Sequence, residues 1–522
     1  MLRNHLLIIF GFVVAVAFVT GYAFSDPPRL QPAPANGVLK AAPKKLHQYL
    51  LIRSRQPENC YGPFLAEILK SEGLNGFTVI DLGSSSFPDL QPTDLVILSR
   101  CFLKNREMDL LLKAVSAGTR AVCIQPSFNL ASRFGWAPQK RVCHPGWVRI
   151  RDGDPGSGTP IQTHVPVALY KPGDSCKEVE VVADAVDAGW KETGHAAAVK
   201  QSFGAGKVAF FFYDLPKAVA RIRFGDPDLA SYFTVGLDWA RHPEAADLFT
   251  GYVDKRVLHV PQADLHGQLL AKVLTGISPY PLARLWYYEK PEHLAAAVFT
   301  SDDDYSTPEQ FRELSASLSA HHGKTTFFLM SDTQLSADDV RKLRDKGNTL
   351  APHVNPFKAQ DELCFDLPRL IEDQTRSFKE RFGQCSVALQ CHWAPWQDYM
   401  LLVQVCAKNG YRMLLAYISW PPELFDRYMC GSARPLKFVG LDGTIHDCWQ
   451  QPIVTFDDDA FEGRFKQNLP AMNKEFKALL DDSLDRHHTP MAFLSHPINY
   501  SRFSKPFMDA CLELINARGV PI

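Results

Sequence analysis

Short apolar runs alternate with amphipathic stretches of helical period along most of this chain. Between residues 45 and 135 the apolar runs are HQYLLI, FTVIDL, TDLVILS and TRAVCIQP, with helical stretches such as 62–73 and 108–118 between them. Parallel strands need a crossover connection, so this alternation is typical of parallel sheets with helices on both faces. We therefore predict an α/β fold with a doubly wound sheet in the first part of the chain.

The pattern divides the 522 residues into two domains, as expected for a chain too long for a single core. Residues 145–212 carry many turn residues and short β runs. A segment rich in proline and aromatic residues, 278–293, precedes a second alternation of strands and helices. We predict an α/β domain over 45–277, with a β-rich part at 145–212, and a second domain over 278–522.

The amino terminus has the composition of an export signal. Residues 6–24 are uncharged and apolar after Arg3, which fits a signal peptide or a membrane anchor within residues 1–25. A Pro-rich linker is predicted over 26–44. Either form of the signal would place the protein in the periplasm or cell envelope. Because 56 Lys and Arg nearly balance 57 Asp and Glu, the charge gives no reason to expect a nucleic-acid partner.

The twelve cysteines contain no CxxC pair, so zinc-finger spacing is absent. In an exported protein some of them can form disulfides, and Cys143 with Cys176 and Cys430 with Cys448 are candidate pairs by loop proximity. Free buried thiols are the alternative.

In the second domain, acidic and histidine residues follow the predicted strands directly. Asp302, Asp303 and Asp304 end the run AAAVFT, and His353, His392, His496 and Asp457 each follow another apolar run. The carboxyl ends of parallel strands meet on one rim, where α/β barrels place their sites. We therefore expect these side chains to gather into one site.

These residues make the domain resemble the polysaccharide deacetylases, which have a NodB-type (β/α) barrel. Thr300-Ser301-Asp302-Asp303-Asp304 is similar to the family motif Thr-Phe-Asp-Asp-Gly, and Leu494-Ser495-His496 is similar to Leu-x-His. The resemblance covers residues 294 to about 500. It implies an irregular barrel, with Asp302 as general base, Asp303 as a metal ligand and His496 as general acid.

Two motifs depart from the family pattern. His353 begins the motif His-x-x-x-His, but Phe357 occupies the second histidine place, and Trp393 stands where the third motif has arginine. Because a catalytic zinc usually has three protein ligands, His392 is our candidate for the third, with Asn355 as an oxygen alternative.

The resemblance implies hydrolysis of an N- or O-linked acetyl group on a polysaccharide, with a divalent metal, in first place zinc. Four aromatic side chains are candidates for stacking on sugar rings, with core packing as the alternative: Trp393, Trp396, Tyr399 and Trp449. Asn355, Arg434 and Asp457 are further candidates for substrate contacts. Arg434 lies in the segment 431–452, which is predicted to form a β insertion that either lines the substrate groove or is a solvated hairpin.

The first domain resembles the class I glutamine-amidotransferase-like domains of flavodoxin type over residues 45–240. That family places its nucleophile in a Gly-x-Cys-x-Gly elbow, and neither Cys101 nor Cys123 has these glycines. We therefore expect a flavodoxin-like domain with a β-rich insertion that lacks the catalytic elbow.

Two other functions remain open from the sequence. Paired carboxylates also serve glycoside hydrolases, with Asp457 and its neighbours as a possible partner for Asp302. Alternatively, the missing histidine and arginine suit a carbohydrate-binding or envelope-assembly protein with a degenerate site.

Overall fold

The computed structural model describes residues 47–522 with short gaps at 55, 58–59, 152–157, 231–242, 287, 289, 359–361, 364–365, 384–385, 420–426, 459–462 and 464. The predicted signal segment and linker, residues 1–44, lie outside the described residues. Among the helices that the structure describes, none combines the length and apolar character needed to cross a membrane.

The first unit is built on a nine-stranded mixed sheet of order β2-β1-β3-β4-β11-β10-β9-β6-β7. The strands from β2 to β11 pair in parallel, and those from β10 to β7 pair antiparallel. The strands are β1 (Gln48–Ile52), β2 (Thr78–Asp81), β3 (Leu95–Leu98), β4 (Arg120–Ile124), β6 (Trp147–Ile150), β7 (Pro160–Gln162), β9 (Lys177–Val186), β10 (Glu192–Phe203) and β11 (Gly206–Phe211). The β-rich part predicted at 145–212 thus extends the same sheet.

Helices cover this sheet, and a small second sheet pairs β5 (Trp136–Cys143) with β8 (Val167–Pro172). The helices are α1 (Gly62–Ser71), α2 (Asn105–Ala117), α3 (Phe128–Arg133), α4 (Leu215–Phe224) and α5 (Gln262–Ile277), with short 3-10 helices η2 (Pro227–Leu229), η3 (Ala245–Phe249) and η4 (Lys255–Val257). Cys101 and Cys123 are buried, and burial raises the pKa of Cys101 to about 12, so this thiol stays protonated at neutral pH.

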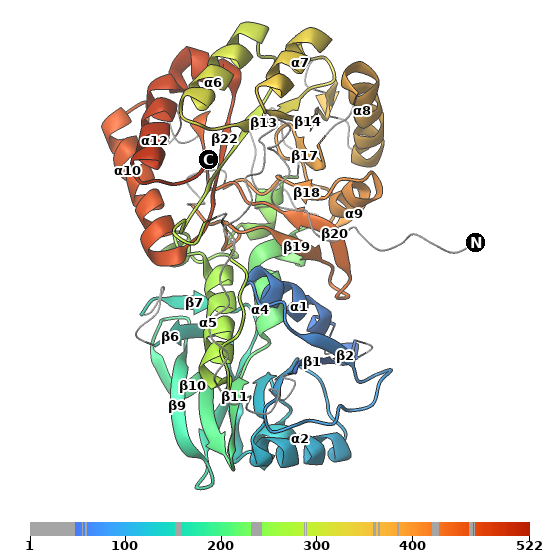
Figure 1. Ribbon diagram of the computed structural model, residues 1–522, viewed down its shortest axis with the longest axis vertical. Coiled ribbons are helices and arrows are strands. Elements are labelled where there is room, and N and C mark those ends of the chain that lie inside the picture. Colours follow the sequence, from blue (N-terminus) through green and yellow to red (C-terminus); the bar gives the residue numbers. More distant parts are fainter. Residues whose placement is uncertain are drawn as a thin grey trace, which may run out of the picture.

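The second unit has a nine-stranded sheet of order β19-β20-β18-β17-β14-β13-β12-β22-β21. All neighbours from β20 to β21 pair in parallel, and β19 pairs antiparallel with β20. The strands are β12 (Ala297–Asp302), β13 (Thr325–Leu329), β14 (Thr349–Val354), β17 (Ala388–Cys391), β18 (Met413–Leu414), β19 (Leu436–Val439), β20 (Ile445–Gln450), β21 (Thr455–Phe456) and β22 (Met491–Ser495). Figure 1 shows this half-barrel above the first unit, with helices on its outer side.

The outer helices of the second unit are amphipathic. They are α6 (Pro308–Ala320), α7 (Ala337–Asp345), α8 (Leu367–Phe382), α9 (Leu401–Lys408), α10 (Leu469–Asp481) and α12 (Lys505–Ala517), with short turns η6 (Asp482–His487), α11 (Pro497–Asn499) and η7 (Tyr500–Ser504) and a two-stranded ribbon β15 (Phe357–Lys358) and β16 (Glu362–Leu363). Helix α6 begins with a capping box, because Thr307 and Gln310 bond reciprocally. This cap fixes the turn that follows Asp302.

One hydrophobic cluster spans the two units. Side chains of α1, α4 and α5 pack with Trp396, Tyr417 and Phe438 of the second unit in a single cluster of buried residues. Buried polar contacts cross the same boundary: Arg434 Nη1 donates to Glu72 Oε1 (2.8 Å), and Arg223 Nε donates to Gln450 Oε1 (2.7 Å). The segment 431–452 contains the hairpin β19–β20, so the predicted β structure is present. The segment packs against the first unit, which differs from both placements predicted for it, along the substrate groove or in solvent.

Both predicted disulfides are wrong. Cys143, Cys176, Cys430 and Cys448 are free thiols, and Cys143, Cys430 and Cys448 are buried. Proximity along the chain does not bring a pair of sulfurs together when each cysteine belongs to a different part of a sheet or core.

A buried histidine of the first unit predicts a pH dependence of stability. Nε2 of His266, on α5, donates to the carbonyl of Gln162 (2.9 Å), and Nδ1 accepts from the Tyr213 hydroxyl (2.8 Å). Burial lowers the pKa of His266 to about 4, although the hydrogen bond to Gln162 has the opposite effect and raises it. The neutral ring is therefore the form that fits this environment.

We expect this histidine to destabilise the fold as the pH falls from about 6.5 to about 4. Between these pH values His266 is protonated in the unfolded chain and neutral in the folded chain. This difference lowers the free energy of unfolding by up to about 3 kcal/mol. Urea unfolding at several pH values should show a shallower pH slope for His266→Gln than for the wild type. The exposed His322→Gln serves as control, and an unchanged slope in His266→Gln would contradict this account.

Candidate metal and hydrolytic site

A cavity of about 280 Å³ opens at the carboxyl ends of the parallel strands of the second unit. Its polar lining includes Asp302, Asp304, His392 and His496, and its apolar wall is formed by Ala416, Ile418, Phe456 and Leu494. These residues come from the ends of β12, β17, β18, β21 and β22 or the loops after them. The gathering of carboxylates and histidines at one rim agrees with the expectation from the sequence.

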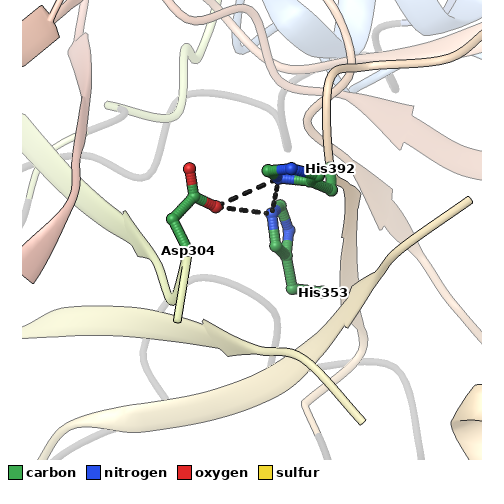
Figure 2. Close-up of side chains that lie close together, drawn as sticks. All are labelled: Asp304, His353 and His392. Atoms are coloured by element: carbon green, nitrogen blue, oxygen red, sulfur yellow. Dashed lines mark hydrogen bonds and ion pairs between the residues drawn. The ribbon is translucent and has the colours of Figure 1, made fainter. Parts of the chain in front are cut away.

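Three side chains converge in this rim, as Figure 2 shows. Asp304 Oδ1 lies 3.4 Å from His353 Nε2 and 3.1 Å from His392 Nδ1, and the two imidazole nitrogens lie 3.3 Å apart. His353 is at the end of β14, and His392 directly follows β17, its backbone N–H donating to the Val354 carbonyl (2.9 Å).

The spacing of these three atoms fits a tetrahedral cation. Zinc binds nitrogen and oxygen at about 2.0–2.2 Å, which places tetrahedral ligand atoms about 3.3–3.6 Å apart. Two imidazoles and one carboxylate also form a ligand set that suits zinc and other first-row transition metals. Asp304, His353 and His392 are therefore one group of described residues at this rim that could hold a metal ion, and Asp457, Asp458 and His496 form a second such group.

The carboxylate in this set differs from the expected one. Asp304 and Tyr305 have φ values of +42° and +61°, and this left-handed turn carries the Asp304 side chain into the cavity. Asp303 lies on the other side of the turn, fully buried, where its Oδ2 accepts from the Met330 N–H (3.1 Å). The predicted ligand Asp303 therefore does not reach the two histidines. Asp304, which stands where the family motif has glycine, lies beside the two histidines instead.

Asp302 lies next to the three converging side chains. Its Oδ2 accepts from Gln390 Nε2 (2.9 Å) and lies 3.6 Å from His353 Nε2. Burial raises the pKa of Asp302 well above its usual value. The charge of His496 lowers this pKa, and the charge of Asp304 raises it further. Without a cation nearby, this carboxyl therefore keeps its proton to a higher pH than a carboxyl in water does.

His496, after β22, is held by a buried carboxylate. Its Nδ1 lies 2.7 Å from Asp457 Oδ1, and its backbone N–H donates to Asp457 Oδ2 (2.9 Å). Its Nε2 is 3.6 Å from Asp304 Oδ2. Burial lowers the pKa of His496, but the charges of Asp457, Asp458 and Asp304 outweigh it and raise the pKa well above its usual value.

The pKa values of Asp304 and His353 are shifted by their surroundings. Burial would raise the pKa of Asp304, but His496 and the bonds from His353 and His392 hold it well below its usual value. Burial lowers the pKa of His353 to about 4 in spite of Asp304. At neutral pH this gives an ionised Asp304 and a neutral His353, which are the protonation states that metal ligands need.

Of the four aromatic candidates for sugar stacking, Trp393 lines the cavity, and Trp396, Tyr399 and Trp449 do not. Trp396 is 1% exposed and packs against Tyr417 and Phe438, and the Tyr399 hydroxyl bonds to the Gly225 carbonyl (3.4 Å). Both belong to the core between the two units, which corrects the prediction of a substrate contact for them. Apolar packing competes with carbohydrate stacking for any aromatic residue in such a sequence.

Two polar candidates also have structural contacts. Arg434 is 6% exposed and pairs with Glu72 across the unit boundary, and Asp457 is fully buried behind His496. Neither placement fits the substrate contact predicted from the sequence. Asn355 donates through Nδ2 to the Tyr305 hydroxyl (2.9 Å), at the edge of the site. The side chain of Phe357 lies outside the described set.

Two contributors to the site were missed by sequence reasoning. Gln390 reaches Asp302 from the strand β17, and Glu244 of the first unit lines the cavity. Gln390 lies two residues before His392, on the same face of a strand, which is a signal that the sequence contains. Glu244 carries no comparable signal, because it approaches from another domain.

No protein-family model matches this chain, and no curated protein matches it. Among solved structures, the family 4 carbohydrate esterase from Streptomyces lividans in complex with acetate is similar at 12% identity and a TM-score of 0.29, over 44% of this chain and 91% of that chain. The polysaccharide deacetylase from Bacillus cereus is similar at 13% identity and a TM-score of 0.28, over 44% and 90%. The exo-beta-1,4-mannosidase from Opitutaceae bacterium strain TAV5 is similar at 14% identity and a TM-score of 0.25, over 33% and 32%. Similarities of this size assign neither a family nor an activity.

The geometry predicts which aspartate binds a metal ion. In calorimetric titrations with Zn²⁺, we expect one ion per wild-type chain and loss of stoichiometric binding in Asp304→Asn and His392→Ala, because each loses a converging ligand atom. Asp303→Asn is the matched control, since an amide oxygen can still accept the Met330 N–H. Retention of zinc by Asp304→Asn together with its loss in Asp303→Asn would contradict this ligand set.

Proposed function

We propose that this chain is an exported, metal-dependent hydrolase that removes N- or O-linked acetyl groups from a polysaccharide of the cell envelope or the extracellular space. The observation that carries the proposal is the convergence of Asp304, His353 and His392 beside Asp302 and His496. The resemblance of the motifs around Asp302 and His496 to those of the polysaccharide deacetylases supports the substrate class.

Asp304, His353 and His392 would hold a divalent cation, for which zinc is our first choice. A bound cation would polarise the acetyl carbonyl and make water more acidic. Its positive charge would also lower the pKa of Asp302, which burial raises. The metal site and the general base are therefore coupled through electrostatics.

The roles of the other residues follow from their protonation. Asp302, once ionised, accepts a proton from the water molecule whose oxygen forms the new bond to the acetyl carbon. His496, which its acidic neighbours keep protonated, gives a proton to the nitrogen or oxygen that leaves as the C–N or C–O bond breaks. Asp457 binds Nδ1 of the ring and thereby aims Nε2 at the cavity. Activity is thus expected to rise with pH as Asp302 loses its proton and to fall again as His496 loses its own.

The remaining parts of the proposal concern fold type and location. The parallel order β2-β1-β3-β4-β11 supports a flavodoxin-type first domain, and the parallel run from β18 to β21 supports a NodB-type barrel. Export is supported by the uncharged residues 6–24. Cell fractionation tests it, and recovery of the whole protein from the cytosol would contradict it.

We expect acetate release from acetylated oligosaccharides to depend on Asp302. Loss of a positioned proton acceptor costs about 10²–10⁴-fold in rate, so Asp302→Asn should lower kcat/KM by at least about 100-fold. N-acetylated chito-oligosaccharides and O-acetylated xylan, compared by acetate assay, distinguish amide from ester hydrolysis. Chelation of the metal should abolish the activity, and added zinc should restore it.

The exposed Asp332→Asn is the control for this experiment. Equal acetate release by Asp302→Asn and the wild type would contradict the role of the base. Cleavage of glycosidic bonds that withstands the chelator would favour a glycoside hydrolase instead.

A further inference from the structure

The cavity at the rim is not built by the second unit alone. Glu244 and Ala246, from the segment that leads into and forms η3 of the first unit, line it together with Trp393 and Ala394. Both residues are buried, with Glu244 5% exposed and Ala246 3% exposed. One wall of the site therefore comes from a part of the chain about 50 residues before the first strand of the barrel-like sheet.

Backbone contacts hold this wall in place. The N–H of Trp396 donates to the Pro243 carbonyl (2.7 Å), and Glu244 forms an isolated antiparallel bridge with Pro395. On the next turn, the ring of Phe249 packs edge-on against Tyr417. The segment therefore lies directly on the loop that carries His392 and Trp393, so its side chains keep a fixed position relative to the metal-binding residues.

Glu244 is an acidic residue that the first unit brings to this cavity. Glu244 and Asp247 form a capping box at the start of η3: the Glu244 carboxyl accepts from the Asp247 backbone N–H, and the Glu244 backbone N–H donates to Asp247 Oδ2 (2.8 Å). This box anchors Glu244 through one of its carboxyl oxygens. Burial, together with the charge of Asp247, raises the pKa of Glu244 to about 8. A carboxyl group in its neutral form both donates and accepts hydrogen bonds, which suits hydroxyl and amide groups.

The size of the cavity limits what can reach Glu244. Its volume of about 280 Å³ lies at the lower end of the range of about 300–1,000 Å³ that is usual for small-molecule sites. There is room for an acyl group and about one sugar ring. The side chains of Ala416, Ile418 and Leu494 form an apolar wall that offers no hydrogen-bonding group to a sugar. The polar partners of a sugar ring must therefore come from the other walls.

We propose that Glu244 is a specificity-determining residue, inserted by the first unit, that hydrogen-bonds a hydroxyl or amide group of the acetylated sugar residue. This inference rests on the proposed function and adds the role of the first unit in it. A site that pairs a buried polar group with the substrate discriminates against analogues that lack the partner group. In this view the acetyl group takes part in the hydrolysis, and the sugar ring determines which acetylated substrates are accepted.

The kinetic test compares two substrates that share the acetyl group. N-acetylglucosamine carries the hydroxyls and the amide, and 4-nitrophenyl acetate carries neither. The ratio of their kcat/KM values should fall about tenfold in Glu244→Ala, the size expected for loss of about one hydrogen bond. It should stay near the wild-type ratio in Glu244→Gln, which keeps a donor and an acceptor, and in the exposed control Glu292→Gln. An unchanged ratio in Glu244→Ala would overturn the proposal.

A binding measurement separates this inference from the proposed hydrolysis. Calorimetry with N-acetylglucosamine on the zinc-loaded full chain should show about tenfold weaker binding for Glu244→Ala than for the wild type. That result would support the subsite even if neither substrate is hydrolysed. If Glu244→Ala does not fold, Ala246→Val narrows the same wall and should weaken binding of the sugar as well. Equal affinities of the wild type and a folded variant of this wall would overturn the role of Glu244.

Discussion

The site depends on three ligand-type atoms that come within 3.1–3.4 Å of one another at the rim of a parallel sheet. Two imidazoles and a carboxylate gain little from such closeness by themselves, because a buried carboxylate loses its hydration. A cation between them would offset that loss and would also ease the repulsion between Asp304 and Asp302. Much of the surrounding structure can be understood as support for this arrangement. The left-handed turn at Asp304, the cap of α6 and the bond from Gln390 to Asp302 each fix one side chain of the rim.

The contact between the two units is the second constraint on the site. A continuous apolar cluster and the buried pair of Glu72 with Arg434 join them, and removal of one partner from such a pair costs about 3–5 kcal/mol. The interface extends from this pair to Trp396 and Pro395, next to the loop of His392. The same contacts that join the units therefore place Glu244 at the cavity. This gives the first unit a role in the site without a nucleophile of its own.

Much of the fold and part of the site could be predicted from the sequence. The strand-and-helix alternation and the capping box at Thr307 depend on local patterns, and both agree with the structure. His353, His392 and His496 could be placed together because strand ends of a parallel sheet share one rim. The choice between Asp303 and Asp304 could not be made, because a backbone turn with positive φ decides which of two adjacent side chains faces the cavity. Trp396, Tyr399 and Arg434 were misassigned for another reason. Each contacts a residue of the first unit more than a hundred positions earlier in the chain, which no local pattern reveals.

The most direct measurement of the central claim is X-ray diffraction from zinc-soaked crystals, with anomalous data collected on both sides of the zinc absorption edge. The account predicts one strong anomalous peak between Asp304 Oδ1, His353 Nε2 and His392 Nδ1, at about 2.0–2.2 Å from each. A peak at Asp303, or zinc bound away from the two histidines, would contradict it.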